Sequence, residues 1–279
     1  MTDRVEPHTS GLPGDVAAES VDSAEQRTPI WRQPHLYRWG SLIIILAVWE
    51  WVGPSINPIF FSYPSAIVRA FFKLLSSGEL WLYMSASLEI LFYGMAFAVI
   101  IGIPLGVIMA RVKVVNWTLE IYVNALYATP MVAVVPILTL LLGIDVVAKT
   151  TVVFLFALFP VLINTYQGVR DVDLRIVEVA RSFRSTERQM WRDVLLPWAV
   201  PYIAAGVRLA IGRALVGMVI AELLTSITGL GYLITRYSHI FEMDKALVPV
   251  IILMFLGIVL TAVLKQLERY VAPWSHEDN

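Results

Sequence analysis

The side chains that could do covalent or metal chemistry are few in this sequence and widely separated. The chain has no cysteine, which excludes a thiol nucleophile, a disulfide framework and a cysteine-zinc site. Its four histidines lack the His-Glu-x-x-His spacing of a zinc hydrolase and lie at His8, His35, His239 and His276. No Gly-x-Ser-x-Gly elbow presents a serine, and no Gly-x-x-x-x-Gly-Lys-Ser/Thr loop could cradle a nucleotide. The sequence therefore predicts no catalytic residue, no metal and no cofactor, and the chain should not bind ATP by itself.

Charged residues inside apolar segments are a second kind of candidate, because ionisable groups are costly in a bilayer and mark functional sites. They are Glu50, Glu89, Arg208, Arg213 and Glu222. Arg208 and Glu222 are fourteen residues apart, which returns to nearly the same face of a helix. In one interpretation the two residues line a translocation pathway, with Arg208 helping an anion across. In the other, Arg208 and Glu222 form a structural pair with each other, or Arg208 extends to the inner membrane interface.

The third candidate is the densest run of charge in the chain, "EVARSFRSTERQMWRDVLLP" at 178–197, with four arginines and three acids. An apolar stripe at helical spacing precedes and enters it, formed by Ile176, Val179, Ala180 and Phe183. Thr186 and Gln189 form a capping box that starts a second helix, and Pro197 marks the entry to the next apolar segment. The pattern predicts two short amphipathic helices joined by a tight turn. Such a pair either docks a partner or lies on the inner leaflet, with its arginines on lipid phosphates.

Long apolar segments must position these residues. The chain is 58% hydrophobic, its mean hydropathy is +0.71, and apolar runs follow one another with short polar breaks. We expect an all-α polytopic membrane protein whose six transmembrane helices cover about residues 39–54, 83–109, 119–142, 148–168, 199–224 and 246–266. The stretch 64–77 predicts an amphipathic surface helix. The membrane domain is expected to cover residues 39–270. It is preceded by residues 1–38, a disordered acidic tail without the features of a cleaved signal, and followed by the tail 271–279.

The distribution of lysine and arginine predicts the orientation. With the N-terminus inside, thirteen of these residues lie on the cytoplasmic side, including six arginines from Arg170 to Arg192. The five on the outer side are Arg69, Lys73, Lys149, Arg236 and Lys245. Because short cytoplasmic loops carry the excess of positive charge, both termini are expected in the cytoplasm. The loop 170–197, between the fourth and fifth spans, is then cytoplasmic as well.

The loop resembles the signature of ABC-importer permeases, which reads Glu-Ala-Ala, three residues, Gly, nine residues, then Ile-x-Leu-Pro. Here Glu178-Val179-Ala180 is followed after three residues by Arg184 and after nine more by "VLLP" at 194–197. The spacing matches at every step. Val179 and Arg184 depart from the signature, and an arginine in place of the turn glycine is expected to change the turn, because glycine there usually has a left-handed backbone.

The resemblance extends over about residues 62–274, through "FFSYPSAI", "FALFPVLINTYQGVRDVD", "LLPWAVPYIAAGVRLAIGRALVGMVIAELL", "GLGYLI" and "APW". These motifs, in this order, are similar to the subfamily that imports nitrate, aliphatic sulfonates, taurine, bicarbonate and related compounds. The resemblance implies a permease subunit in the bacterial inner membrane that passes a small anionic solute. It also implies three kinds of partner: a second permease subunit in a homodimer, two cytoplasmic ABC ATPases and an extracytoplasmic binding protein.

The resemblance further implies that the loop 172–196 is a coupling-helix pair seated in a groove of the ATPase. The residues assigned to this contact are Glu178, Val179, Ala180, Arg181, Phe183, Arg184, Trp191, Leu196 and Pro197. Two rival classes remain. A membrane-embedded enzyme would need clustered His, Asp or Glu ligands, which the sequence lacks, and a non-transporting scaffold would use the same helix pair to hold a cytoplasmic partner. No nucleic-acid partner is expected.

Overall fold

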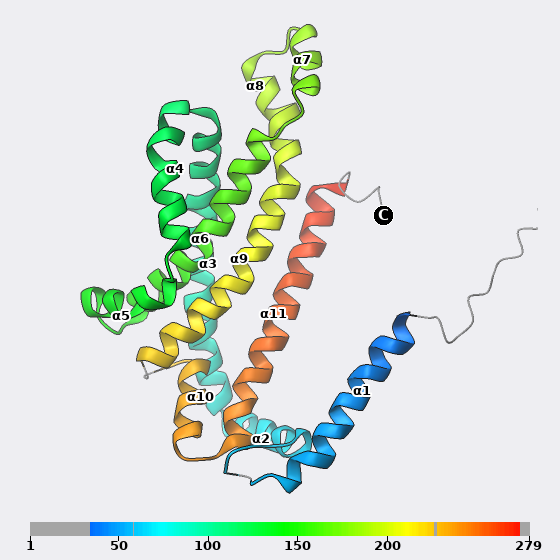
Figure 1. Ribbon diagram of the computed structural model, residues 1–279, viewed down its shortest axis with the longest axis vertical. Coiled ribbons are helices and arrows are strands. Elements are labelled where there is room, and N and C mark those ends of the chain that lie inside the picture. The colour runs from blue at the N-terminus through cyan, green and yellow to red at the C-terminus, as the bar shows by residue number, and fades with distance from the viewer. Residues whose placement is uncertain (1–33, 58, 226–227, 274–279) are drawn as a thin grey trace, which may run out of the picture. The chain divides into compact units, whose positions relative to one another are not determined.

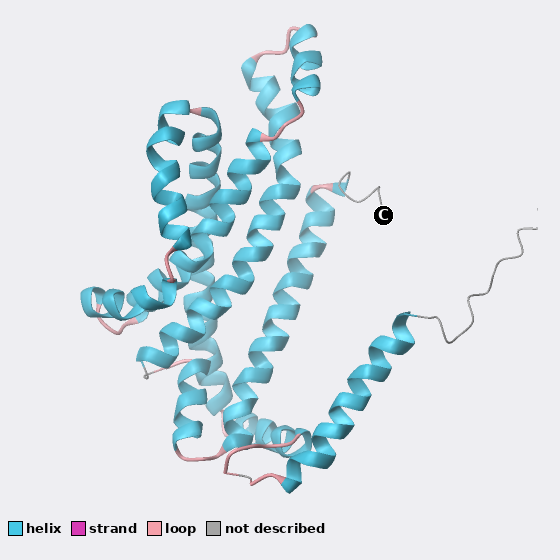
Figure 2. Ribbon diagram, viewed as in Figure 1, coloured by secondary structure: helices cyan, strands magenta, loops and turns pink. Residues whose placement is uncertain are grey.

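The computed structural model describes residues 34–57, 59–225 and 228–273, and in these ranges all regular structure is helical (Figures 1 and 2). The chain divides into two compact units, Met1–Ala47 and Val48–Asn279. Of the first unit, the described residues form the beginning of α1 (Pro34–Val52). The second unit contains all the candidate sites and is described by itself below.

Three long helices form the centre of the second unit: α3 (Glu79–Arg111), α6 (Val146–Arg170) and α9 (Leu196–Thr225). They contain the predicted segments 83–109, 148–168 and 199–224. Glycines permit the close approach of α3 and α6. A Cβ atom on Gly94 would lie 2.4 Å from Val153 Cγ1, and one on Gly106 would lie 2.7 Å from the Leu162 carbonyl oxygen. Small residues at helix contacts are the usual way in which membrane helices pack closely.

Two further helices cover this centre. α11 (Met243–Val271) packs against α9 and contains the predicted segment 246–266. α2 (Pro64–Ser76) is the helix expected at 64–77, and it buries one face, made by Ile67, Ala70 and Leu74, against α10 and α11. Pro64 suits the first turn of α2, where its missing N–H costs nothing. In addition, Glu50 accepts a hydrogen bond from the backbone N–H of Ser65 at 2.9 Å.

The predicted single segment 119–142 is two helices. α4 (Lys113–Ala128) and α5 (Met131–Leu142) meet at a bend of 98°. Proline explains the break, since Pro130 has no N–H to donate and pushes the preceding residue into an extended conformation. Thr129 has φ −69° and ψ 133°, outside the helical region. As a result α5 runs across the bundle rather than along it (Figure 1).

A short helix, α10 (Leu230–His239), was not predicted; it follows α9 and packs against α9 and α11. In the described residues, four helices are long and apolar enough to cross a membrane: α3, α6, the continuous helix Glu187–Thr225 and α11. The bent pair α4–α5 would be a fifth. The apolar part of the first helix, Trp39–Ser55, is shorter than these. The described residues are therefore all-helical, with four or five apolar helices long enough to cross a membrane, which is consistent with a polytopic membrane protein.

Candidate functional site

The charged loop contains α7 (Leu174–Ser182) and α8 (Glu187–Gln189). Asp173 caps α7 by accepting the Arg175 backbone N–H at 2.9 Å, and hydrogen bonds from the Arg175 side chain and backbone hold the pKa of the Asp173 carboxyl below its usual value. The predicted capping box of α8 is present. Thr186 N donates to Gln189 Oε1 at 2.8 Å, and Gln189 N donates to Thr186 Oγ1 at 3.4 Å.

The turn between the two helices is a Schellman motif centred on Arg184. Ser185 N donates to Ala180 O at 3.2 Å, and Arg184 N donates to Arg181 O at 2.8 Å, the two bonds that define the motif. Arg184 has φ +56°, in the left-handed region. The expectation that arginine would change this turn is therefore wrong. The backbone has the conformation that usually favours glycine, and the side chain is accommodated because it is exposed.

The second loop helix is continuous with α9, whereas the sequence predicted a boundary at Pro197. The two parts join through a π-helical stretch, Met190–Leu195, in which the Leu196 N–H donates to the Trp191 carbonyl. Pro197 would interrupt a regular α-helix because it lacks an N–H and crowds the carbonyl four residues earlier. A wider helical turn directly before proline accommodates both effects.

The loop has a small core of its own. Met190 and Leu195 are buried together with Val172, and Ala180 and Trp191 pack against them. In addition, the guanidinium of Arg111, at the end of α3, lies 4.6 Å from the centroid of the Trp191 ring. The loop is thus fixed both to α9, by continuity, and to α3.

Most of the residues assigned to partner docking are at the surface. Glu178, Val179, Arg181, Phe183, Arg184 and Leu196 are exposed, while Ala180, Trp191 and Pro197 are half-buried. The predicted stripe is divided, because Ala180 packs into the loop core but Ile176, Val179 and Phe183 point outward. Phe183 is 82% exposed. An exposed aromatic ring among arginines and a glutamate is the type of surface that binds another protein.

The structure does not pair Arg208 with Glu222. The Arg208 guanidinium forms an ion pair with Glu268 of α11. Glu222 is 1% exposed and lies in a cluster that joins three helices. Its Oε1 accepts the Ser87 hydroxyl of α3 at 2.6 Å, and its Oε2 accepts the Gly231 N–H of α10 at 2.8 Å.

The same cluster holds the beginning of α10. Leu230 N donates to Ser87 Oγ at 2.8 Å, so the serine hydroxyl bridges α10 and Glu222. Gly229 has φ +104°, and a Cβ atom there would lie 2.1 Å from the Glu222 carboxyl carbon. Ser87 is not among the residues predicted from the sequence. The motif "GLG" at 229–231 was visible in the sequence, but its contact with Glu222 was not.

Lys149 was counted among the outer loop residues, but it lies in the first turn of α6 and is 3% exposed. Its ammonium donates to the Thr228 hydroxyl at 2.9 Å and to the Thr228 carbonyl at 3.3 Å. This contact ties the start of α6 to the segment between α9 and α10. In the described residues, no group of three or more His, Asp or Glu side chains could hold a metal ion.

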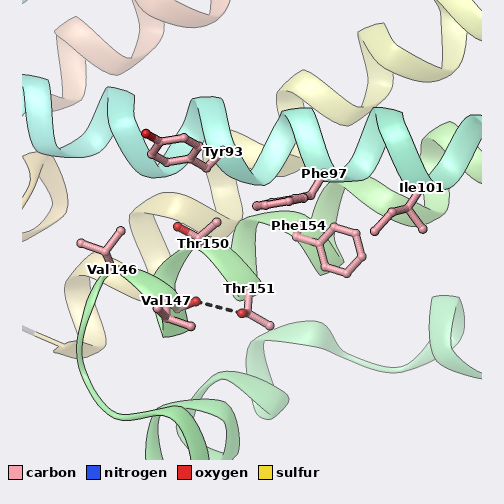
Figure 3. A pocket seen from close by; sticks show the side chains of 8 residues that line it. All are labelled: Tyr93, Phe97, Ile101, Val146, Val147, Thr150, Thr151 and Phe154. Carbon is pink, nitrogen blue, oxygen red and sulfur yellow. Dashed lines mark hydrogen bonds between the residues drawn. The ribbon is translucent and has the colours of Figure 1, made fainter.

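A cavity of about 440 Å³ lies between α3 and α6 (Figure 3). Its lining residues are Tyr93, Phe97, Ile101, Val146, Val147, Thr150, Thr151 and Phe154. No charged side chain lines it, and the Thr151 hydroxyl donates to the Val147 carbonyl of its own helix at 2.8 Å. An apolar cavity of this kind does not suit an anion, because nothing in its lining would compensate the charge.

Known proteins resemble this chain over most of its length. The family described as binding-protein-dependent transport system inner membrane component matches residues 102–275. A putative aliphatic sulfonates transport permease protein of Bacillus subtilis is 32% identical over 244 residues, covering 85% of this chain and 88% of the relative. A formylaminopyrimidine transport permease protein of Halalkalibacterium halodurans is 28% identical, covering 83% and 93%. A taurine transport system permease protein of Escherichia coli is 27% identical, covering 90% and 94%.

A similar fold occurs in a solved structure, an inward-facing conformation of the MetNI methionine ABC transporter. The TM-score is 0.57 at 20% sequence identity, covering 67% of this chain and 93% of the solved chain. At this identity the likeness concerns the fold alone.

Proposed function

The chain belongs to the family of binding-protein-dependent transport system inner membrane components, and we propose that it is the permease subunit of an importer for a small anionic solute. Sulfonates are the first solutes to test. The proposed substrate class is supported by the 32% identity of this chain to a permease named for aliphatic sulfonates. The relative named for taurine, itself a sulfonate, supports the same class. An extracytoplasmic binding protein would deliver the solute, and ATP would be hydrolysed on two separate ATPase subunits.

The loop 172–196 is the seat of the ATPase in this proposal. Its support is the surface of α7, where Val179 and Phe183 are exposed next to Glu178. An unpartnered apolar face costs free energy in water, roughly 25 cal/mol per Å². The loop core and the Arg111–Trp191 contact make this surface part of the helical bundle, so a movement of the partner would reach α3 and α9 together.

We place six spans across the membrane, with both termini in the cytoplasm. The thirteen-to-five distribution of lysine and arginine supports this orientation. A reporter fused after Asn279 should be cytoplasmic, and one inserted in 227–244 should be outside. If both reporters were active on the same side of the membrane, the six-span topology would be wrong.

A second copy of the chain completes the pathway in this proposal. Its support is α4, in which none of the described residues is buried although Trp117, Ile121 and Tyr122 are apolar or aromatic. For Arg208 and Glu222, the contacts described above support the structural interpretation rather than a place in the pathway. Arg208 joins α9 to α11 through Glu268, and Glu222 joins α3, α9 and α10.

Reconstitution tests the proposed function. The permease, its ATPase and its binding protein are incorporated into proteoliposomes, and ATP hydrolysis and uptake are measured with and without taurine or ethanesulfonate. Stimulated hydrolysis together with accumulation inside the vesicles supports an importer of sulfonates. A non-transporting scaffold would retain the ATPase but accumulate neither compound.

A further inference from the structure

Arg213 lies near the middle of α9, twelve residues before its end at Thr225 and seventeen after its start at Leu196. At 1.5 Å per residue these separations are about 18 Å and 26 Å. The hydrocarbon core of a bilayer is about 30 Å thick. The guanidinium therefore lies well inside the apolar layer. A permanently charged group at this depth normally faces a polar partner or a water-filled cavity.

The other basic residues of the central helices have partners, but Arg213 does not. Arg208 pairs with Glu268, and Lys149 is held by Thr228. Arg213 is exposed and makes no hydrogen bond or ion pair within the described part of the chain.

The surface around Arg213 is open. A Cβ atom built on the neighbouring Gly212 would meet no atom within 4 Å, and both Leu209 and Val216, one turn away on either side, are exposed. Among the described residues of the second unit, no helix covers Leu209, Gly212 or Val216, whereas Gly217, one turn after Arg213, packs against Phe156 of α6. This face differs from the one that packs on α11, which includes Arg208, paired with Glu268, and Leu215, whose Cδ1 would lie 3.3 Å from a Cβ atom on Gly257.

The direction of the open face follows from Ile220. This residue is seven positions after Arg213, about two turns along nearly the same side of the helix. Ile220 packs against the cluster of Val135, which belongs to α5. Arg213 thus lies about two turns from the contact of α9 with α5, on nearly the same side of α9 as Ile220. α11 covers another side of α9.

We propose that Arg213 binds the oxyanion group of the transported solute, a sulfonate or carboxylate, inside the pathway, and that each of two copies contributes one Arg213. This rests on the proposed function, whose substrate class it deepens. The guanidinium is planar, remains charged and donates a fork of N–H groups that matches the oxygens of such an anion. An open, unpaired guanidinium two turns from α5, toward the start of α9, gives the solute a site after it has passed that helix. The alternative occupant is a carboxylate of the second copy, such as Glu89 of α3, which is also exposed and unpaired within the described residues.

Thiol labelling tests whether Arg213 faces water. Because the chain has no cysteine, Arg213→Cys has a single thiol. The complete complex in proteoliposomes is treated with the anionic reagent sulfonatoethyl methanethiosulfonate. We expect the reagent to label this thiol from the aqueous pathway during ATP turnover. The comparison variant is Phe92→Cys, at an exposed position near the middle of α3. Labelling of Arg213→Cys no faster than that of Phe92→Cys would overturn the proposal, since the site would not face an aqueous path.

Uptake tests whether the charge acts on the solute. Arg213→Gln should reduce ethanesulfonate uptake about 10- to 100-fold, which corresponds to the loss of one charge-assisted hydrogen bond to the solute. Arg213→Lys, which keeps the charge but loses the fork, should reduce it less. Val216→Ala is the control on the same face, with uptake within about twofold of wild type. Parallel measurements with propionate distinguish a carboxylate from a sulfonate.

The outcomes separate the two hypotheses. If the wild-type complex accumulates neither ethanesulfonate nor propionate, the proposed substrate class is wrong and the role of Arg213 is wrong with it. If the wild type accumulates either anion and Arg213→Gln does so equally well, the role of Arg213 alone is overturned. If Arg213→Gln no longer co-purifies with its ATPase, and Glu89→Gln behaves in the same way, Arg213 is a counter-ion between copies and the proposal is overturned.

Discussion

Replacing Ser87 by alanine removes one hydroxyl that takes part in two buried hydrogen bonds. The hydroxyl donates to Glu222 Oε1 at 2.6 Å and accepts the Leu230 N–H at 2.8 Å. Ser87 is 0% exposed, so the change leaves a carboxyl oxygen and a backbone N–H without their partners in the interior. The connection between α3 and the start of α10 is lost, while the Gly231 bond to Glu222 stays in place.

The expected cost follows from these two bonds. In a bilayer, an interhelical hydrogen bond is worth about 0.6–2 kcal/mol, because separated helices also find polar partners in the membrane. Two such bonds give a decrease of about 1–4 kcal/mol in the free energy of unfolding. We expect the upper half of this range, since an unsatisfied buried polar group costs about 1–3 kcal/mol by itself.

The assay is unfolding of the purified protein in mixed micelles, followed by circular dichroism as denaturing detergent increases. Trypsin cleavage after Arg236 reports on α10 separately. The matched control is Ser85→Ala in the same helix, where the exposed hydroxyl donates only to the Leu82 carbonyl of its own turn at 2.9 Å. If Ser87→Ala and Ser85→Ala differ by less than about 0.5 kcal/mol, the cluster does not stabilise the fold as we infer.

Three further changes test the charged loop 170–197. Glu178→Lys should release the ATPase or uncouple ATP hydrolysis from uptake, whereas Asp171→Lys, at an exposed acid at the base of the same loop, should do neither. The measurements are co-purification of the ATPase and solute uptake. A Glu178→Lys complex that is normal in both would refute docking at α7. Arg184→Gly should raise the thermal stability of the protein by about 1 kcal/mol, because glycine adopts φ +56° without steric cost, and a lower stability would contradict the strain argument. The lowered pKa of Asp173 means that its cap contributes stability above the unfolded-state pKa and that this contribution is lost as the pH falls through the folded-state pKa. The protection of the α7 amides, measured as the exchange rate relative to that of an unfolded peptide at the same pH, should therefore fall below about pH 4, and Asp173→Asn should remove this dependence.

Local sequence signals predicted the elements that depend on neighbours in the chain. The capping box at Thr186 and Gln189 is formed by residues three positions apart, so it could be read directly and is confirmed. The long helices α3, α6, α9 and α11 correspond to long apolar runs with few charges, which predict membrane helices with little dependence on tertiary structure.

The bend between α4 and α5 was not predicted, because the mean hydropathy of a segment does not show the single residues that break a helix. Thr129 and Pro130 interrupt an apolar run without making it polar, and membrane helices often tolerate proline. Only the structure shows that the chain turns by 98° at this point. Helix α10 was missed for a related reason: its ten residues are too few to give an apolar run, although it contributes Leu230 and Leu233 to the core.

The contacts of the intramembrane charges could not be predicted because their partners are distant in sequence. Ser87 is 135 residues from Glu222, and Glu268 is 60 residues from Arg208. Helical spacing placed Arg208 and Glu222 on similar faces of one helix, but spacing on a single helix does not reveal what the neighbouring helices present. The same limitation hid the difference between Arg208, which has a partner, and Arg213, which is open.

The continuity of the helix Glu187–Thr225 connects the loop with the membrane sites. One end of this helix follows the Schellman turn at Arg184, and the other end carries Glu222, which contacts the start of α10. Between them lies Arg213. A displacement of the loop along the helix axis would be transmitted to α9, whereas a sideways displacement would bend the helix at the π-helical stretch before Pro197. An axial displacement would shift the open guanidinium and the buried cluster together.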